Sequence, residues 1–511
     1  MKLIGLDIGT TGCKASLFES DGRLLASASR EYRVDIPNPG WAEQDAGRVW
    51  LLAQECLREV YQKAGPSEPV AAIGLSCQGE AVTPVDGAGR PLRPTILGMD
   101  TRTDAENAWL REKVGAEALF QKTGMPLHTI NTLPKLLWIQ SHEPDIWRQA
   151  THFLLYEDFL IQKMTGQPVT SACLASRTQM FDLAAGGWSS ELLDLIGLDE
   201  RRLAPVAPSG TPAGEMLPDL ARAIGFPNRP MIATGGHDQA CGALGVGLVR
   251  PGLCMVSTGT AEVVEVALDQ PALTPPLERG NISVYAHVIP GMYLAMTLNH
   301  SGGLVLRWFR DEFCGEAVQR AEAEGVDPYD AIFGQLSPDP SPLLLLPHFS
   351  GSGTPQLDTE SKGAVLGLTF ASTREDVAKA ILEGLTFELR NNLEVLREGG
   401  VRIEELRAIG GGARSEVWLQ LKADVTGVMV RPPRITEAAS WGAAVLGGVA
   451  AGCFHSAAGA VQQSLQFDRP RKPDPRLQTL YEARYQLYLR IYPALKDILH
   501  QLTSDERQFA L

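Results

Sequence analysis

The chain contains a short hydroxyl-rich turn twice, and each copy lies between two strand-like apolar runs. The first copy, Gly9-Thr10-Thr11-Gly12, interrupts the apolar stretch 3–18. The second, Ser257-Thr258-Gly259-Thr260, follows about one domain length later and precedes the apolar run 263–267. A turn repeated at this distance predicts two related lobes that each direct one turn toward the same ligand. With 511 residues, the chain is also too long for a single hydrophobic core and is expected to form two or three domains.

The first turn has a chemistry that suits a bound anion. Its glycine amides and the hydroxyls of Thr10 and Thr11 can surround a phosphate, and Asp7 can hold a metal ion through water. The pattern D-x-G-T-T-x-x-K ends at Lys14, but Cys13 stands where a Walker loop requires glycine. A plain hairpin with a polar turn is the alternative, and this motif alone does not exclude it.

The stretch 232–247 carries one carboxylate on a rigid turn near the middle of the chain. It predicts a buried strand, the double-glycine turn Gly235-Gly236 and a helix of small residues that begins near Asp238. A carboxylate at a domain junction suits a general base, although a simple helix N-cap is the alternative. His237 precedes it, and the sequence assigns that histidine no role.

Two further strand-like runs end in side chains that can recognise hydroxyl groups. Run 70–77 leads to Gln78-Gly79-Glu80, and run 93–99 leads to Asp100. Amide and carboxylate groups bind vicinal diols through paired hydrogen bonds, so these residues predict a shared polar pocket. A solvated turn or an internal ion pair is the alternative for each of them.

A triple-glycine turn follows the strand-like run 406–409. Because Gly410, Gly411 and Gly412 carry no Cβ, a purine or ribose can lie against this turn, and Ser415 begins the helix that follows. Such a turn can also serve only to let two elements cross. Helices are expected at 47–64, over most of 103–230, and at 301–313 and 374–398, with one long amphipathic helix at 474–502.

Charge and cysteine content exclude several classes of partner. The net charge is −14 and no long run of lysine and arginine occurs, which argues against nucleic acid. The eight cysteines never form C-x-x-C, so neither a zinc site nor a disulfide framework is expected, and a cytoplasmic location fits. Asp7 interrupts any signal-peptide core, and the longest uncharged run, 438–454, is too short to span a bilayer.

Six motifs, in order, resemble those of the FGGY carbohydrate kinases. They are Asp7-x-Gly-Thr-Thr, Gly235-Gly-His-Asp-Gln239, Ser257-Thr-Gly-Thr260, Phe349-Ser-Gly-Ser-Gly-Thr-Pro355, Gly363-Ala-Val-Leu-Gly-Leu368 with its following helix, and Gly410-Gly-Gly-Ala-Arg-Ser415. The similarity extends over about residues 3–500.

The resemblance implies an α/β fold with two actin/hexokinase-type, ribonuclease H-like lobes and a cleft between them. Each lobe would contain a mixed five-stranded sheet flanked by helices. The N-terminal lobe would comprise residues 1–247, with the sugar site, the first phosphate turn and the catalytic aspartate. The C-terminal lobe would comprise residues 248–511, with the second phosphate turn and the adenosine site.

The resemblance also implies ATP and Mg²⁺ as cofactors and a role for each motif. Asp238 would be the catalytic base and would help Asp7 to hold the metal. The other expected contacts are Thr10, Thr11, Lys14, Thr258, Gly259 and Thr260 with the ATP phosphates, Gly411, Gly412 and Ser415 with adenosine, and Gln78, Glu80, Asp100 and Gln239 with the sugar.

The sugar end departs from both well-known patterns of the family. Xylulokinases usually read Q-M-H-G where this chain has Gln78-Gly79-Glu80-Ala81, and glycerol kinases read Q-R-E. The stretches 287–291 and 307–311 resemble a branch that includes pentulose, polyol and autoinducer-2 kinases. The expected reaction is phosphorylation of a primary hydroxyl of a ketopentose such as xylulose.

Several alternatives stay open at this point. Within the family, the acceptor could be a polyol (glycerol, erythritol or a pentitol) or the autoinducer-2 precursor. Outside it, the alternatives are an actin-like or chaperone-like ATPase and an inactive sugar-sensing regulator. A small sugar or polyol is the expected partner, without nucleic acid or membrane, and a homodimer is one assembly open to the chain.

Overall fold

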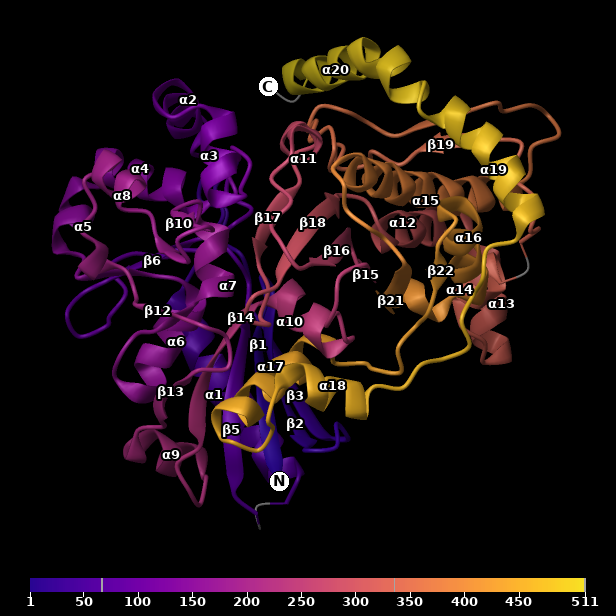
Figure 1. The fold of residues 1–511 in the computed structure, drawn as a ribbon. Coiled ribbons are helices and arrows are strands. Elements are labelled where there is room, and N and C mark those ends of the chain that lie inside the picture. Colours follow the sequence, from indigo (N-terminus) through magenta and orange to yellow (C-terminus); the bar gives the residue numbers. More distant parts are fainter. Residues whose placement is uncertain (66–67, 335, 510–511) are drawn as a thin grey trace.

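Two lobes, each built on a six-stranded sheet, form the computed structural model, which describes residues 1–65, 68–334 and 336–509 (Figure 1). The first sheet has the strand order β13-β14-β5-β1-β2-β3, and the second has the order β17-β18-β16-β15-β21-β22. Helices lie on the faces of both sheets. The expected α/β fold with two lobes is confirmed.

The first sheet is built around β1 (Lys2–Ile8), which is buried along almost its whole length. This strand pairs antiparallel with β2 (Gly12–Glu19) and parallel with β5 (Val70–Cys77). Because both faces of a central strand are covered, residues 3–6 are continuously apolar rather than alternating. β3 (Leu24–Glu31) continues the hairpin from β2, and the three expected N-terminal strands are therefore confirmed.

The second sheet repeats this arrangement. β15 (Leu253–Thr258) pairs antiparallel with β16 (Glu262–Leu268) and parallel with β21 (Glu405–Gly410), as β1 does with β2 and β5. β18 (Tyr293–Asn299) takes the place of β3, and β22 (Met429–Val430) takes that of β14. The repeated turn in the sequence therefore reflects a repeated sheet topology.

Each sheet has one strand more than the five that were expected. The additional edge strands are β13 (Pro212–Glu215), next to β14 (Met231–His237), and β17 (Ser283–Ala286), next to β18. Pro212 and a register shift against β14 mark β13 as an edge strand, which a proline can begin without losing a ladder hydrogen bond. Both strands are short, so periodicity in the sequence does not reveal them.

Helix α17 (Ala438–Ala450) belongs to the second half of the sequence but covers the first sheet. It packs against β1, β5 and β14, and Figure 1 shows it in orange beside the indigo strands. A Cβ at Gly74 would lie 1.8 Å from the carbonyl oxygen of Ala443, so β5 admits this helix only because it has a glycine there. α10 (Asp238–Gly245) packs against α17 in turn. The second half of the chain therefore completes the core of the first lobe. The division of the chain at residue 247 stays a prediction.

The remaining elements surround these sheets. In the first half the helices are α1 (Ala46–Lys63), α2 (Asp104–Lys113), α3 (Ala116–Thr123), α4 (Thr132–His142), α5 (Pro144–Gln149), α6 (Tyr156–Thr165), α7 (Ala172–Ala175), η1 (Ser176–Thr178), α8 (Ser190–Leu195), η2 (Glu200–Arg202) and α9 (Pro218–Ile224). In the second half they are α11 (Pro275–Arg279), α12 (Gly303–Phe313), α13 (Gly315–Glu324), α14 (Pro328–Phe333), α15 (Arg374–Glu398), η3 (Gly411–Arg414), α16 (Glu416–Thr426), α18 (Ala457–Ser464), α19 (Pro475–Tyr488) and α20 (Ile491–Phe509). The short strands are β4 (Glu43–Gln44), β6 (Thr83–Val85), β7 (Thr95–Ile96), β8 (His152–Leu154), β9 (Thr170–Ser171), β10 (Phe181–Asp182), β11 (Gly187–Trp188), β12 (Val206–Ala207), β19 (Leu344–Leu346) and β20 (Ala364–Leu366).

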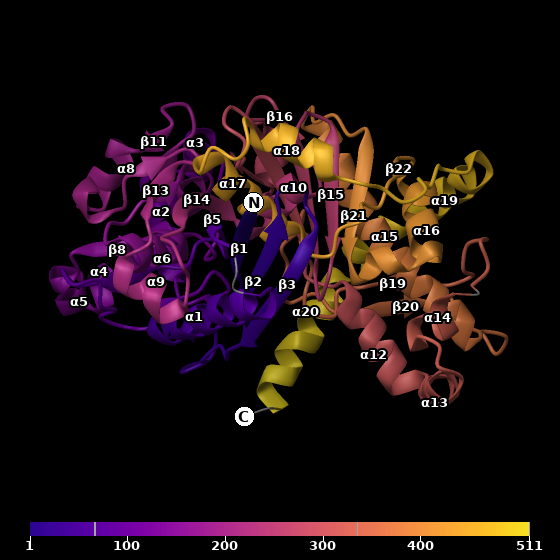
Figure 2. The same cartoon turned by 90° about the horizontal axis from the view of Figure 1, so that it is seen from below.

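The C-terminal tail forms two helices where one long helix was expected. α19 ends at Tyr488 and α20 begins at Ile491, and α20 extends away from the body of the molecule in Figure 2. Pro493 explains the break, because its ring would clash with the carbonyl of Leu489 in a continuous helix. In the described part of the chain, no helix has the length and apolar character that crossing a membrane requires.

Candidate active site

Three neighbouring strands of the first sheet end at one edge and carry the acidic part of the site there. β1 and β14 both pair in parallel with β5, so their carboxyl ends meet on the same side. Asp7 lies opposite Ser76 in this register, and its carboxylate accepts a 2.5 Å hydrogen bond from the Ser76 hydroxyl. Burial raises the pKa of Asp7.

Asp238 begins α10 directly after the end of β14. Its Oδ1 accepts a 2.6 Å hydrogen bond from the amide of Gln239, and 26% of the side-chain surface stays exposed. Burial raises the pKa of Asp238 to about 7, and the negative charge of Asp7 contributes to the rise. The structure thus brings together the two carboxylates that the sequence picked as metal ligands. A carboxylate that titrates near neutral pH and is open to solvent on one side suits a general base.

Gln78 lies at the same edge, where it supports the first turn. Its Nε2 donates to the carbonyl of Gly9 at 3.2 Å, and its Oε1 accepts from the Thr10 hydroxyl at 3.4 Å. Gln44 braces the same turn, since its Nε2 donates to the carbonyl of Thr10 at 2.9 Å. Gln78 is buried, and the contacts that the structure shows for it are with the turn and with Gln44. A contact with sugar stays a prediction for this residue.

Glu80 is engaged by Arg177, a residue that the sequence analysis did not single out. The Nε of Arg177 donates to Oε1 of Glu80 at 2.6 Å, and both side chains are buried. Arg177 also donates to the hydroxyl of Ser283 at 3.1 Å and lies 4.6 Å above the ring of Tyr285. Both of these residues belong to β17 of the second sheet, so Arg177 links the two lobes. No local pattern marks Arg177, because Glu80 lies 97 positions away in the sequence.

Asp100 forms an internal ion pair, which was the alternative to a sugar contact. It is fully buried, it accepts a 2.6 Å hydrogen bond from the amide of Ala42, and Arg102 donates to both of its oxygens. Arg102 in turn lies 3.7 Å above the ring of Trp41. The structure therefore places Asp100 in a loop-fixing cluster, and it provides no exposed carboxylate there for a sugar.

His237 now has defined partners. Its Nε2 lies 3.2 Å from Oδ1 of Asp238, and its Nδ1 lies 3.2 Å from the hydroxyl of Tyr285. That hydroxyl donates to Glu265 at 2.6 Å, and burial raises the pKa of Glu265 to about 8. Burial, with the nearby charge of Arg177, holds the pKa of His237 well below its usual range, so the imidazole is neutral. A buried polar chain thus connects Asp238 to the second sheet.

Lys14 is tied to the segment that leads into α17. Its Nζ lies 3.0 Å from both carboxylate oxygens of Glu437, the residue just before that helix. The ion pair joins β2, just after the first turn, to a part of the chain more than four hundred residues away. A contact between Lys14 and ATP stays a prediction.

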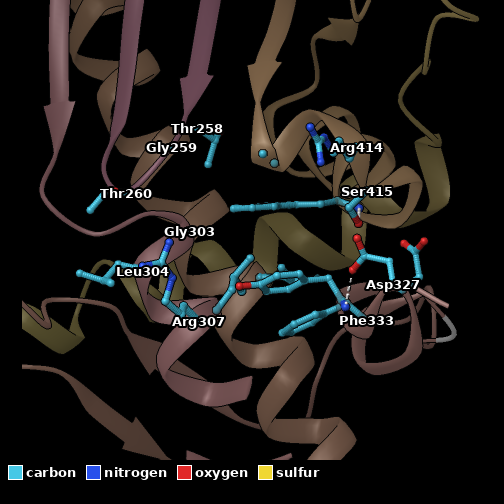
Figure 3. A pocket seen from close by; sticks show the side chains of 17 residues that line it. Thr258, Gly259, Thr260, Gly303, Leu304, Arg307, Asp327, Phe333, Arg414 and Ser415 are labelled. Atoms are coloured by element: carbon cyan, nitrogen blue, oxygen red, sulfur yellow. Dashed lines mark hydrogen bonds between the residues drawn. The ribbon is translucent and has the colours of Figure 1, made fainter. Parts of the chain in front are cut away.

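The second turn and the triple-glycine turn line one cavity of about 470 Å³ (Figure 3). A Cβ at Gly412 would lie 2.9 Å from the Cβ of Thr258, so the two turns nest because glycine stands at 412. The hydroxyl of Thr258 donates to Glu262 at 2.7 Å and accepts from Lys422, whereas Thr260 is exposed. The cavity lining includes all six residues predicted from these turns: Thr258, Gly259, Thr260, Gly411, Gly412 and Ser415.

Other lining residues were not predicted. α12 provides Gly303, Leu304 and Arg307, while Tyr329 and Phe333 on α14 and Trp418 on α16 add aromatic surface. Thr10, Thr11 and Lys14 are not among the described residues that line this cavity. The structure thus joins the two turns of the second lobe in one cavity, whereas the first turn lies against Gln78 and Gln44 in the first lobe.

Both sites fit the groups that the sequence predicted. A cavity of about 470 Å³ with aromatic and glycine walls lies in the size range of small-molecule sites and suits adenosine. Asp7 and Asp238 provide the hard carboxylate oxygens that Mg²⁺ prefers, and a cation would relieve the repulsion that raises the pKa of Asp238. In the described part of the chain, no group of three or more acidic, histidine or cysteine side chains is placed so that it could bind a metal ion.

Comparisons with known proteins point to one family. The FGGY family of carbohydrate kinases matches with its N-terminal domain over residues 2–245 and its C-terminal domain over residues 254–451. The xylulose kinase of Escherichia coli (strain K12) is 30% identical over 497 residues, which cover 97% of this chain and 99% of that protein. The autoinducer-2 kinase of the same strain is 30% identical over 501 residues, which cover 96% and 94%.

A solved structure shows the same fold. The xylulose kinase from Rhodospirillum rubrum superposes with a TM-score of 0.88 at 28% identity and covers 98% of this chain and 100% of its own. The family match extends over both lobes and includes the Asp7, Asp238 and second-turn motifs. The chain therefore belongs to the FGGY family of carbohydrate kinases.

Proposed function

We propose that this protein transfers the γ-phosphoryl group of ATP to a primary hydroxyl of a ketopentose such as xylulose. As a member of its family the chain is an ATP-dependent sugar phosphotransferase, and the identity of the acceptor is what we add. The observation that carries the phosphotransfer chemistry is the place of Asp238 at the start of α10, with its carboxylate 26% exposed beside His237, and the choice of a ketopentose rests on the matched xylulose kinases.

Phosphoryl transfer needs little covalent help, so the protein has to position the reactants, neutralise charge and exclude water. In our proposal Asp238 orients the acceptor hydroxyl and takes its proton as the new O–P bond forms. The hydrogen bond from the amide of Gln239 and the contact with His237 hold the carboxylate in place. Exclusion of water by lobe closure would prevent hydrolysis of ATP.

The nucleotide site would extend from the second-lobe cavity toward the first turn. Gly259 and Thr260 would contact the phosphates, and Gly411, Gly412 and Ser415 would contact adenosine. Thr10, Thr11 and Lys14 would approach the phosphates from the first lobe. Asp7 and Asp238 would hold Mg²⁺, which when bound offsets the negative charge of the phosphate groups.

Support for a ketose acceptor comes from the similarity to xylulose kinases and not from contacts seen in the sugar site. Glu80 and Asp100 are engaged by arginines, which leaves Gln78 and Gln239 as the predicted sugar residues outside those ion pairs. The matched xylulose kinases in sequence and structure favour a ketopentose. The autoinducer-2 precursor is the second candidate, because the autoinducer-2 kinase is equally similar at 30% identity.

A coupled ADP-release assay would test the acceptor. Ketopentoses, ketohexoses, pentitols, erythritol, glycerol and the autoinducer-2 precursor would be compared at equal concentration with ATP and Mg²⁺, and acceptor-free ATPase would be subtracted. We expect the highest kcat/KM with a ketopentose. If polyols alone respond, or if the autoinducer-2 precursor is preferred, the ketopentose proposal is wrong while the kinase class is unaffected.

We also propose a cytoplasmic location. All eight cysteines are free, and seven of them are buried. Free thiols are typical of proteins in a reducing compartment. Fractionation of the source cells followed by immunodetection would test this proposal, and recovery in a periplasmic or secreted fraction would contradict it.

A further inference from the structure

The imidazole of His237 lies beside the carboxylate of Asp238 and is held from its far side by the second sheet. Its Nε2 is 3.2 Å from Oδ1 of Asp238, and its Nδ1 is 3.2 Å from the hydroxyl of Tyr285. The ring of Tyr285 also packs edge-on against the imidazole. Both His237 and Tyr285 are buried, so their protein neighbours and not solvent fix the orientation of the imidazole.

The hydrogen bonds on the far side determine which nitrogen carries the proton. The hydroxyl of Tyr285 donates its proton to Glu265 at 2.6 Å, so toward His237 it can only accept. Nδ1 is therefore the protonated nitrogen of the neutral ring, and Nε2 carries a lone pair. In the part of the chain that the structure describes, no residue donates a hydrogen bond to Nε2. The structure thus presents two neighbouring acceptors, Nε2 of His237 and Oδ1 of Asp238.

The chain that follows β5 leaves Nε2 uncovered. Gly79 stands two residues after the end of this strand, and a Cβ there would lie 3.0 Å from Cδ2 and 3.2 Å from Nε2 of His237. A longer side chain at position 79 would therefore cover the acceptor or displace the ring. Two lone pairs this close repel each other unless donors approach both of them. A buried acceptor pair of this kind calls for a ligand with two donor groups.

We propose, on the basis of the transfer to a primary hydroxyl proposed above, that Nε2 of His237 accepts a hydrogen bond from the hydroxyl on the carbon next to the reacting one. The two hydroxyls of a vicinal diol are spaced much as the two acceptors are. One hydroxyl can meet the carboxylate of Asp238 while its neighbour meets the imidazole. A nitrogen atom suits Mg²⁺ poorly, which makes a hydroxyl the better ligand for Nε2.

His237 would thus select acceptors by their second hydroxyl and would take no part in the proton transfer. Every acceptor proposed for the ADP-release screen carries a hydroxyl beside a primary alcohol, so the choice among them does not decide the role of His237. A chain that releases ADP with none of these acceptors would contradict the proposed function itself. The role of His237 is tested separately, with pairs of acceptors that differ in one hydroxyl.

Each pair consists of the best acceptor from the screen and its analogue that lacks only the vicinal hydroxyl. The ratio of their kcat/KM values, measured with ATP and Mg²⁺, gives the contribution of that hydroxyl. We expect the wild type to prefer the diol by about tenfold or more. His237→Leu removes the acceptor nitrogen and should bring the ratio close to one. His237→Gln can place an amide oxygen near the position of Nε2 and should keep part of the preference.

His455→Leu is the matched control and should keep the wild-type ratio. His455 is exposed in the loop between α17 and α18, at the end of α17 opposite Glu437. Because each ratio is taken within one variant, a smaller fraction of active protein does not change it. Thermal unfolding followed by circular dichroism would verify that each variant is folded.

A wild type that uses the diol and its deoxy analogue equally well would overturn the proposal. A folded His237→Leu variant that keeps the wild-type ratio would overturn it as well, because another residue would then recognise the hydroxyl. If His237→Leu turns over neither acceptor, calorimetric affinities of the wild type and the variant for the same two acceptors give the ratio, and the same outcomes decide.

Discussion

At the scale of single residues, the neighbourhood of Asp238 explains why one carboxylate can serve as a base. Burial and the charge of Asp7 raise its pKa to about 7, and the amide of Gln239 holds Oδ1 in place. Asn at this position would keep the shape and the hydrogen bond but could not accept the proton. We expect Asp238→Asn to lower kcat by roughly 10²–10⁴-fold and to leave ATP affinity nearly unchanged.

Steady-state kinetics and calorimetric titration with a non-hydrolysable ATP analogue would measure the two effects separately. Asp219→Asn is the matched control, because the Asp219 side chain is 89% exposed on α9, remote from the cleft edge. Near-normal turnover in Asp238→Asn would remove Asp238 from the role of base.

The ion pair of Glu80 and Arg177 should contribute to the unfolding free energy. Both side chains are buried and paired, so Arg177→Met would leave the carboxylate of Glu80 buried without its cation. Breaking a buried pair from one side costs about 3–5 kcal/mol of unfolding free energy. Glu80→Gln combined with Arg177→Met should recover part of this loss, since residue 80 then carries no buried charge that needs the arginine. Urea unfolding of both variants measures the difference, and a double variant no more stable than Arg177→Met would contradict the explanation.

At the scale of secondary-structure elements, the contact between α17 and β5 depends on glycines. A Cβ at Gly74 would lie 1.8 Å from the carbonyl oxygen of Ala443, and the obstacle is backbone that cannot rotate away. We expect Gly74→Ala to lower the unfolding free energy by about 1–3 kcal/mol or more, as overpacking does. Gly315→Ala is the control, because its Cβ would meet nothing within 4 Å at the start of α13. Denaturant unfolding should separate the two, and equal stability would show that α17 can shift.

The contact between α15 and α19 predicts a dependence of stability on pH. Glu383 on α15 accepts hydrogen bonds from Tyr481 on α19 and from the amide of Ser341, and burial raises its pKa to about 7. An unfolded glutamate titrates near 4.5. Between these values the folded state binds the additional proton, so the unfolding free energy falls as pH rises from about 4.5 to 7.

Glu383→Gln should remove this contribution. We expect wild type to lose about 1–3 kcal/mol relative to the Gln variant between pH 5 and pH 8, as measured by urea unfolding at both pH values. The exposed Glu375 on the same helix provides the control Glu375→Gln, for which the difference from wild type should not change with pH. A constant difference for Glu383→Gln would contradict the buried-proton explanation.

At the scale of the whole molecule, the sequence was most informative where neighbouring residues form one unit. The strands around Gly9–Gly12 and 257–260, the helix at 374–398 and the Asp238 turn follow from local patterns, and the structure contains all of them. Arg177 could not be found, because the ion pair with Glu80 and the contact with β17 arise only from tertiary packing. For Asp100 the sequence left a sugar contact and an internal ion pair open, because it shows the carboxylate but not the burial that accompanies Arg102.

The contacts of α17 bear on the division of the chain at residue 247. Trp441, Ala443 and other buried residues of α17 cover the face of the first sheet that includes Leu3 and Phe18. A fragment of residues 1–250 would expose this face, so we expect it to bind a hydrophobic dye, to aggregate and to unfold without cooperativity. Co-expression with residues 251–511 should yield a soluble 1:1 complex, because the second fragment restores α17. A fragment that is monomeric and unfolds cooperatively alone would show instead that the first lobe is an independent domain.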